Sequence, residues 1–138
     1  MIRKISAIVL GALLAFGVRA AAQAFSHAMY PSQPGLDLHN SQQARLYFET
    51  VPAGGLLLVL VGAAVSTLAG AWFAAFIAKE RPLFYGGIVG LLVLVGTIIN
   101  FYDIPHPTWF MIVSFLCIPV MAFIGSWLGA HSTKPATL

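Results

Sequence analysis

The stretch PAGGLLLVLVGAAVSTLAGAWFAAFIA, from Pro52 to Ala78, contains no ionisable side chain. An α-helix rises about 1.5 Å per residue, so about 20 apolar residues cross the ~30 Å hydrocarbon core of a bilayer. This stretch is long enough to cross that core with some tilt. It therefore predicts a transmembrane helix at residues 53–78.

Small residues recur in this predicted helix at four-residue steps and form one face. They are Gly62, Ser66, Gly70, Ala74 and Ala78, with a second row of Ala63, Thr67, Ala71 and Ala75. The bulky residues lie on the opposite side: Leu57, Val61, Val65, Leu68, Trp72 and Phe76. Lipid tails are as apolar as leucine, so membrane helices associate mainly where small side chains let their backbones approach. The small face is therefore predicted to pack against other helices, and the bulky face to contact lipid or to fill gaps at the rim of the bundle.

The composition of the whole chain agrees with a membrane location. Of the 138 residues, 59% are hydrophobic and only 8% are charged, whereas soluble domains carry about 25% charged residues. The basic residues outnumber the acidic ones by seven to four, but they are scattered at segment ends and form no patch, which argues against nucleic acid as a partner. The single cysteine, Cys117, rules out an internal disulfide and a cysteine-based zinc site.

Three further apolar segments predict an all-α bundle of four transmembrane helices, forming a single domain over residues 1–138. The predicted spans are residues 5–25, 53–78, 83–101 and 108–130, with an ordered outer loop at 26–52. The turn at 79–82 is short, so the second and third spans are predicted to be antiparallel neighbours. Gly86 with Gly90, and Gly125 with Gly129, repeat the small-residue spacing in the last two spans.

The first span has two interpretations. Its basic start, its apolar core and the sequence Ala22-Gln23-Ala24 are typical of a secretory signal peptide with its cleavage site. A stripe at four-residue spacing favours a retained helix instead, because a removed leader needs no interaction face. The stripe consists of Ala7, Gly11, Ala15, Arg19, Gln23 and His27.

The outer loop is the only long polar segment. Its first half is rich in turn formers such as Pro31, Pro34 and Gly35, and predicts an ordered, irregular loop. Residues 40–50 predict a short helix capped by Asn40 or Ser41. In that helix Leu46, Tyr47 and Phe48 are expected to rest on the membrane surface.

Basic residues are distributed unequally between the two sides of the predicted bundle. One side has only Arg45, and the other has Arg3, Lys4, Lys79, Arg81 and Lys134. Because cytoplasmic loops carry the excess of Lys and Arg, both termini are predicted to be cytoplasmic.

Polar side chains gather at the outer end and form a candidate cluster. Its residues are Arg19, Gln23, Glu49, Asn100, Asp103 and His106. Arg19 lies within the outer leaflet, where a charged side chain is costly, so a partner is expected. Glu49 and Asp103 are the predicted partners. The role of Arg19 is left open between contact with lipid headgroups, a structural ion pair and ligand binding.

The sequence assigns no catalytic, metal-binding or cofactor-binding residue, and the cofactor is left open. His27, His39 and His106 could ligate zinc or copper together with nearby carboxylates, but their spacing matches no metal motif. No GxSxG motif and no glycine-rich phosphate loop occurs. The predicted midplane carries no carboxylate, which argues against a proton-coupled antiporter of the small four-helix multidrug type.

Three short motifs carry a resemblance to known proteins. They are Tyr30-Pro31-x-x-Pro34-Gly35-Leu36-Asp37, Val51-Pro52-Ala53-Gly54 and Ile104-Pro105-His106-Pro107-x-Trp109-Phe110. With them the chain resembles a widespread group of small bacterial inner-membrane proteins with four predicted spans. The resemblance implies the topology and a bacterial inner-membrane location, and it implies no activity or substrate.

Three functions are consistent with these features. The leading hypothesis is a non-enzymatic accessory or scaffolding subunit, which contacts the lipid bilayer and self-associates or joins another membrane protein through its small-residue faces. The alternative is a protein that binds or transports a small solute or ion at the outer polar cluster. The third is a periplasm-facing metal-binding protein or membrane enzyme.

Overall fold

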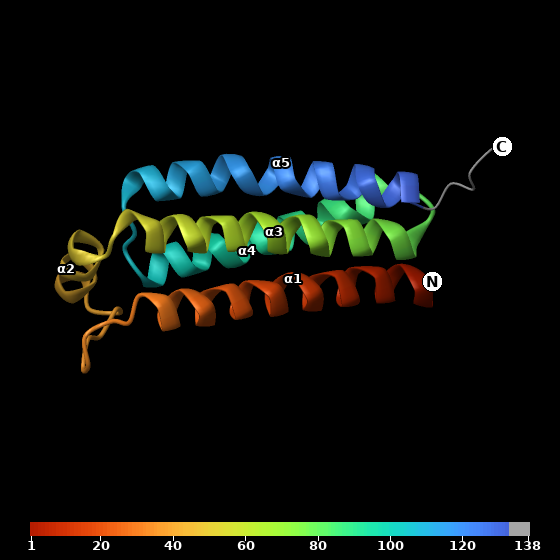
Figure 1. The fold of residues 1–138 in the computed structure, drawn as a ribbon. Helices are drawn as coiled ribbons and strands as arrows, with labels where there is room; N and C mark the ends of the chain where they lie inside the picture. Colours follow the sequence, from red (N-terminus) through yellow and green to blue (C-terminus); the bar gives the residue numbers. More distant parts are fainter. Residues whose placement is uncertain (133–138) are drawn as a thin grey trace.

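A computed structural model describes residues 1–132 of the chain, and it is helical almost throughout. Its helices are α1 (Ile2–Met29), α2 (Ser41–Thr50), α3 (Ala53–Ala78), α4 (Pro82–Asp103) and α5 (Thr108–Ser132). The four long helices run side by side, and the short helix α2 lies across one end of them (Figure 1). Each long helix is long and apolar enough to cross a membrane. The chain is a multi-pass membrane protein with an all-α, four-helix transmembrane bundle.

Helix α3 is the centre of the bundle, because α1, α4 and α5 all pack against it. The predicted division of its surface is confirmed. Both rows of small residues, from Gly62 to Ala78, are buried. On the bulky face Leu57, Val61 and Val65 are each about half exposed, as expected for side chains in lipid.

Helices α1 and α3 approach each other closely at two glycines. A Cβ atom added to Gly11 would lie 2.8 Å from the Cβ of Ala74 and from the backbone oxygen of Gly70. A Cβ atom added to Gly70 would lie 2.6 Å from the Cβ of Ala15. Neither position has room for a side chain, so glycine sets the distance between these two helices.

The small-residue pairs of the last two spans also pack against other helices of the same chain. Gly125 and Gly129 of α5 lie against the backbone of α3, at the carbonyls of Leu68 and Trp72. Gly86 and Gly90 of α4 face α5, at Ser126 and Ala122. The small faces identified in the sequence are therefore occupied by the chain's own helices.

Three of the predicted spans are longer than expected. Helix α1 ends at Met29 rather than at residue 25, α4 ends at Asp103 rather than at 101, and α5 ends at Ser132 rather than at 130. In α1 the Tyr30 N–H still donates to the Ser26 carbonyl at 2.8 Å. Pro31 follows, and the residue before a proline is disfavoured in helical conformation. The polar residues at the end of α1 are thereby held on a regular helix.

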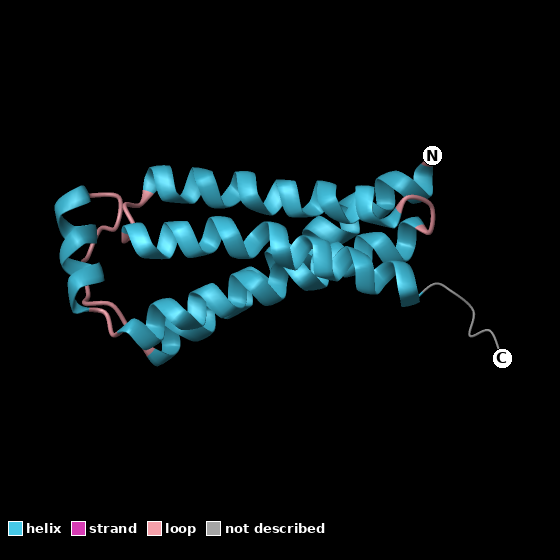
Figure 2. Ribbon diagram, turned by 90° about the horizontal axis from the view of Figure 1, so that it is seen from above, coloured by secondary structure: helices cyan, strands magenta, loops and turns pink. Residues whose placement is uncertain are grey.

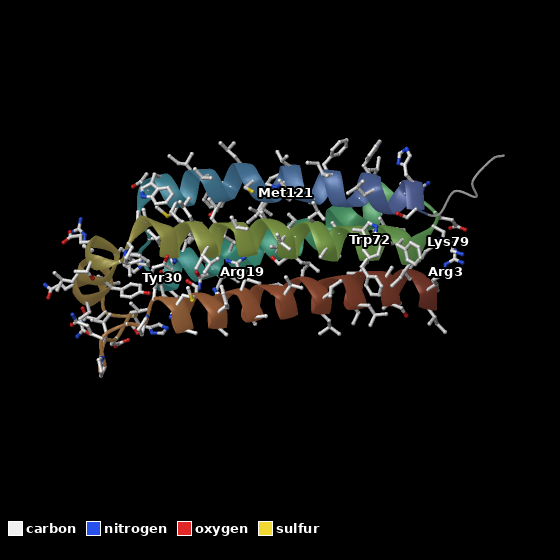
Figure 3. All side chains as sticks on the ribbon, viewed as in Figure 1. Arg3, Arg19, Tyr30, Trp72, Lys79 and Met121 are labelled. Atoms are coloured by element: carbon white, nitrogen blue, oxygen red, sulfur yellow. The ribbon has the colours of Figure 1, made fainter. Side chains whose placement is uncertain are left out.

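Basic residues lie at the end of the bundle opposite to α2. Lys4 pairs with Glu80 at 3.1 Å, and Arg3 and Lys79 lie at this same end in Figure 3. Arg45 belongs to α2 at the other end. The predicted contribution of Lys134 to the basic side lies outside the described residues.

Candidate functional site

The long helices separate from one another at the end that carries α2 (Figure 2). A cavity of about 100 Å³ lies at this end, with residues of α2 in its lining. We call it the outer cavity. Leu56 and Val59 of α3 contribute to its apolar lining. Its polar lining comes from α1, α2, α4 and the intervening loops, and consists of Gln23, Ser26, His27, Tyr30, Tyr47, Asn100 and His106. Three of the six candidate cluster residues, Gln23, Asn100 and His106, are therefore brought together.

Among the polar groups of this lining, the side-chain amides of Gln23 and Asn100 have the most hydrogen-bond donors and acceptors without a partner in residues 1–132. Each amide offers two N–H donors and one carbonyl acceptor. Neither amide makes a hydrogen bond to another side chain or backbone group of residues 1–132. Polar groups in a half-buried site require hydrogen-bond partners, so both amides are available to a small polar molecule or to water in the cavity.

Arg19 lies one helical turn deeper than this lining. It precedes Gln23 by four residues on α1, and it points from α1 towards the other spans (Figure 3). Its Nη1 donates a hydrogen bond of 2.6 Å to the hydroxyl of Thr97. Thr97 precedes Asn100 by one turn on α4 and is only 1% exposed. Arg19 and Thr97 thus form a polar pair directly below the two amides.

The prediction that Arg19 pairs with Glu49 or Asp103 is wrong. Among residues 1–132, neither carboxylate lies within ion-pairing distance of Arg19. Both carboxylates are exposed at the outer end of the bundle. Asp103 lies six residues beyond Thr97 on α4, or about 9 Å farther out along the helix axis. The hydroxyl of Thr97, and not a carboxylate, is the group at the level of Arg19.

Three aromatic rings surround the side chain of His106. Its ring lies 4.8 Å from that of Phe48, 4.9 Å from that of Phe101 and 5.4 Å from that of Phe110. Its Nδ1 lies 2.6 Å from the carbonyl oxygen of Ile104. Because a carbonyl can only accept, Nδ1 carries the proton, and a neutral ring then presents Nε2 as an acceptor.

The environment of His106 favours its neutral form. Burial lowers its pKa most, the positive charge of Arg19 lowers it further, and the hydrogen bond to Ile104 partly opposes both effects.

Helix α2 forms the roof of the outer cavity. Its predicted cap is confirmed, because the Asn40 side chain accepts from the Gln42 N–H at 3.0 Å. The expectation that Tyr47 and Phe48 rest on the membrane surface is wrong. Both line the cavity, and burial raises the pKa of Tyr47, which keeps its hydroxyl protonated.

The inward face of α2 follows from its helical spacing. Ala44, Tyr47 and Phe48 are three and four residues apart and share one side of the helix, where Ala44 is fully buried. The backbone of α2 has no close approach to the other described helices. The roof is therefore attached through side chains, chiefly by Phe48 on His106.

The remaining candidate residues lie outside the cavity. Glu49 lines a separate groove beside α2, which also reaches His106. Asp103 is exposed and lines none of the described pockets. His39 contacts Asp37 at 3.3 Å in the exposed loop. In the part of the chain that the structure describes, no three His, Cys, Asp or Glu side chains are placed to hold a metal ion.

The sequence did not identify Thr97, Tyr30 or Phe48 as site residues. The position of Thr97 three residues before Asn100 on one helix was an available signal, because such residues share a face. Tyr30 lies over α3, where a Cβ atom added to Gly54 would meet its hydroxyl oxygen at 2.9 Å. No local pattern predicts that contact.

All three motif segments meet at the outer cavity. Tyr30 comes from the first, Val51 from the second, and Ile104, His106 and Phe110 from the third. No protein-family model, no curated protein and no solved structure matches the chain.

Proposed function

We propose that this membrane protein binds a small polar solute in the outer cavity. The observation that carries the proposal is the pair of amides, Gln23 and Asn100, which line one cavity from two different spans and have no hydrogen-bond partner within residues 1–132. Ligand sites are typically concave and largely apolar, with a few polar groups that fix orientation. The outer cavity has this composition.

The size of the cavity limits the solute. A protein cavity of about 150 Å³ binds benzene, so a cavity of about 100 Å³ suits a molecule smaller than benzene. The roof made by α2 is attached through side chains, so a local movement of Phe48 and Tyr47 admits the solute. The site is one for a compact metabolite or ion, and not for a lipid tail or a peptide.

The side of the membrane follows from charge. Arg3, Lys4, Lys79 and Arg81 support a cytoplasmic location for the end opposite to α2, by the positive-inside rule. Both termini are then cytoplasmic, and the outer cavity faces the periplasm of a bacterial inner membrane, as the resemblance implies. The meeting of all three motifs at the cavity supports a shared binding role.

The accessory or scaffolding hypothesis remains a second prediction with weaker support. It depended on small-residue faces free to contact a partner or a second copy. The faces of α3, α4 and α5 pack within the chain, so an association with another subunit requires a different surface.

Native mass spectrometry tests the proposed function. The full chain, purified from membranes in mild detergent, is expected to carry a small non-covalent adduct. Asn100→Leu and Gln23→Leu are expected to remove the adduct. Asp103→Asn, a polar change outside the cavity, is expected to retain it. A wild-type chain without an adduct, and without stabilisation by a panel of small polar solutes, contradicts the proposal.

A further inference from the structure

The charge of Arg19 has no counter-ion in the bundle. Its hydrogen-bond partner, Thr97, is a neutral hydroxyl. Among residues 1–132 the ion pair of Lys4 with Glu80 lies at the opposite end, and the contact of His39 with Asp37 lies in the outer loop. A charge inside a membrane span is expected to pair with an opposite charge or to lie against water. Arg19 has five N–H donors, and the hydroxyl of Thr97 uses one of them.

The outer cavity is the polar space next to this charge. Gln23 and Asn100, which line the cavity, stand one turn above Arg19 and Thr97 on the same two helices. The polar lining contains amides, hydroxyls and imidazoles but no Asp or Glu. A cation would meet an uncompensated like charge there, whereas an anion would meet N–H and O–H donors and the field of a guanidinium.

We propose that the solute bound in the outer cavity is a small oxyanion, of which a short carboxylate of acetate size is the simplest, and that Arg19 is its counter-charge. The inference rests on the proposed function and adds the chemical class of the ligand. The amide N–H groups of Gln23 and Asn100 and the Tyr47 hydroxyl donate to the oxyanion. Arg19 does not itself line the cavity. Its guanidinium lies one helical turn below and supplies the opposite charge through its electrostatic field.

A lipid headgroup phosphate offers the same chemistry from another source. Tyr47 and Phe48 of α2 line the outer side of the cavity and narrow its opening to the surface. The small volume of about 100 Å³ favours a free anion over a headgroup that carries two acyl chains.

The test measures thermal unfolding of the full chain in a non-ionic detergent without phospholipid. Acetate, formate and phosphate are titrated against chloride at constant ionic strength, and acetamide serves as the neutral analogue of acetate. Saturable stabilisation by an oxyanion is expected. Arg19→Gln is expected to weaken that response at least tenfold. Arg45→Gln, which removes an exposed outer cation, is expected to leave it unchanged.

A second variant covers the case in which Arg19→Gln does not fold. Asn100→Asp places a carboxylate in the cavity wall, one turn above Arg19. It is expected to raise the melting temperature by supplying the counter-ion, and to abolish the response to acetate. Asn100→Asp with an unchanged acetate response contradicts the role of the cavity in anion binding.

The outcomes separate this inference from the proposed function. Stabilisation by acetamide but not by any oxyanion overturns the anion inference and retains a solute site. If neither acetamide nor any oxyanion stabilises the protein, and native mass spectrometry detects no adduct, both the anion inference and the proposed function are overturned. Stabilisation only in nanodiscs that contain phospholipid, with no response to free oxyanions, assigns the charge to a headgroup and overturns the inference of a free anion.

Discussion

Arg19 on α1 donates a 2.6 Å hydrogen bond to the hydroxyl of Thr97 on α4, and that hydroxyl donates in turn to the carbonyl of Val93 at 2.8 Å. The first and third spans are thereby joined by a polar contact inside an apolar bundle. The contact fixes a guanidinium at one depth, directly below the amides of Gln23 and Asn100.

Thr97→Val is expected to lower the free energy of unfolding by about 1.5 to 3 kcal/mol, because hydrogen bonds to charged groups contribute about that much. Thr67→Val is the matched control. Thr67 is equally buried, but its hydroxyl bonds only to Ala63 of its own helix, at 2.7 Å, so a smaller loss is expected. Unfolding in detergent measures both variants.

A double-mutant cycle between Arg19→Gln and Thr97→Val extends this test. Residues in direct contact show non-additive effects, so the two losses are expected to sum to more than the loss in the double variant. Additive losses would mean that the hydrogen bond is absent in the folded protein in detergent.

Gly70→Ala is expected to destabilise the bundle by about 1 to 3 kcal/mol, the usual cost of overpacking. The added methyl group would lie 2.6 Å from the Cβ of Ala15 and from the Gly11 carbonyl oxygen. Gly87 has no heavy atom of another residue within 4 Å of such a methyl group. Gly87→Ala is therefore expected to be neutral, or stabilising by up to about 1 kcal/mol through helix propensity. Equal effects of the two substitutions would contradict the close packing of α1 on α3.

The stability of the protein is expected to fall as the pH decreases from 7 to 5. The pKa of His106 is lower in the folded state, mainly through burial. The unfolded chain therefore takes up a proton first, near its ordinary value of about 6.5, and stability falls from there towards the folded pKa. Melting temperatures across this range measure the effect.

His106→Gln is expected to flatten the pH dependence, and His39→Gln, a change in the exposed loop, is expected to preserve it. The pairing of Glu80 with Lys4 lowers the pKa of that carboxyl. Its contribution is lost below about pH 4.5, outside this window. An unchanged pH profile in His106→Gln would assign the effect to another group.

Phe48→Ala is expected to loosen the roof of the outer cavity. The ring of Phe48 lies 4.8 Å from that of His106, and aromatic pairs contribute about 0.5 to 1.5 kcal/mol. Amide hydrogen exchange over residues 41–50 is therefore expected to accelerate by up to about tenfold. Leu46→Ala, which removes an exposed side chain from the same helix, is the control and is expected to change exchange little.

The transmembrane spans and the packing face of α3 could be predicted from the sequence because both follow from local rules. An apolar run long enough to cross a bilayer is visible along the chain, and small residues at four-residue spacing mark one side of a single helix. The burial of Gly62, Ser66 and Gly70 follows from that spacing alone.

The partner of Arg19 could not be predicted in the same way. The residue that lies level with Arg19 depends on the axial offset between α1 and α4, and that offset is set by contacts of α1 with α3 at Gly11 and Gly70. The sequence predicted a carboxylate partner, Glu49 or Asp103, whereas the group level with Arg19 is the hydroxyl of Thr97. The inward position of Tyr47 and Phe48 likewise depends on how α2 is oriented over the bundle. The sequence of α2 alone does not determine which side of this helix faces the bundle.

Helix α1 provides Gln23, Ser26 and His27 to the outer cavity and carries Arg19 below it. A signal peptidase cut after Ala24 would remove Arg19 and Gln23 while leaving three complete spans in the membrane. A chain cut by signal peptidase therefore cannot form the outer cavity with Arg19 below it. Only the uncut chain retains every residue of the proposed anion site, so the early fate of its N-terminal segment at the membrane decides whether that site can form.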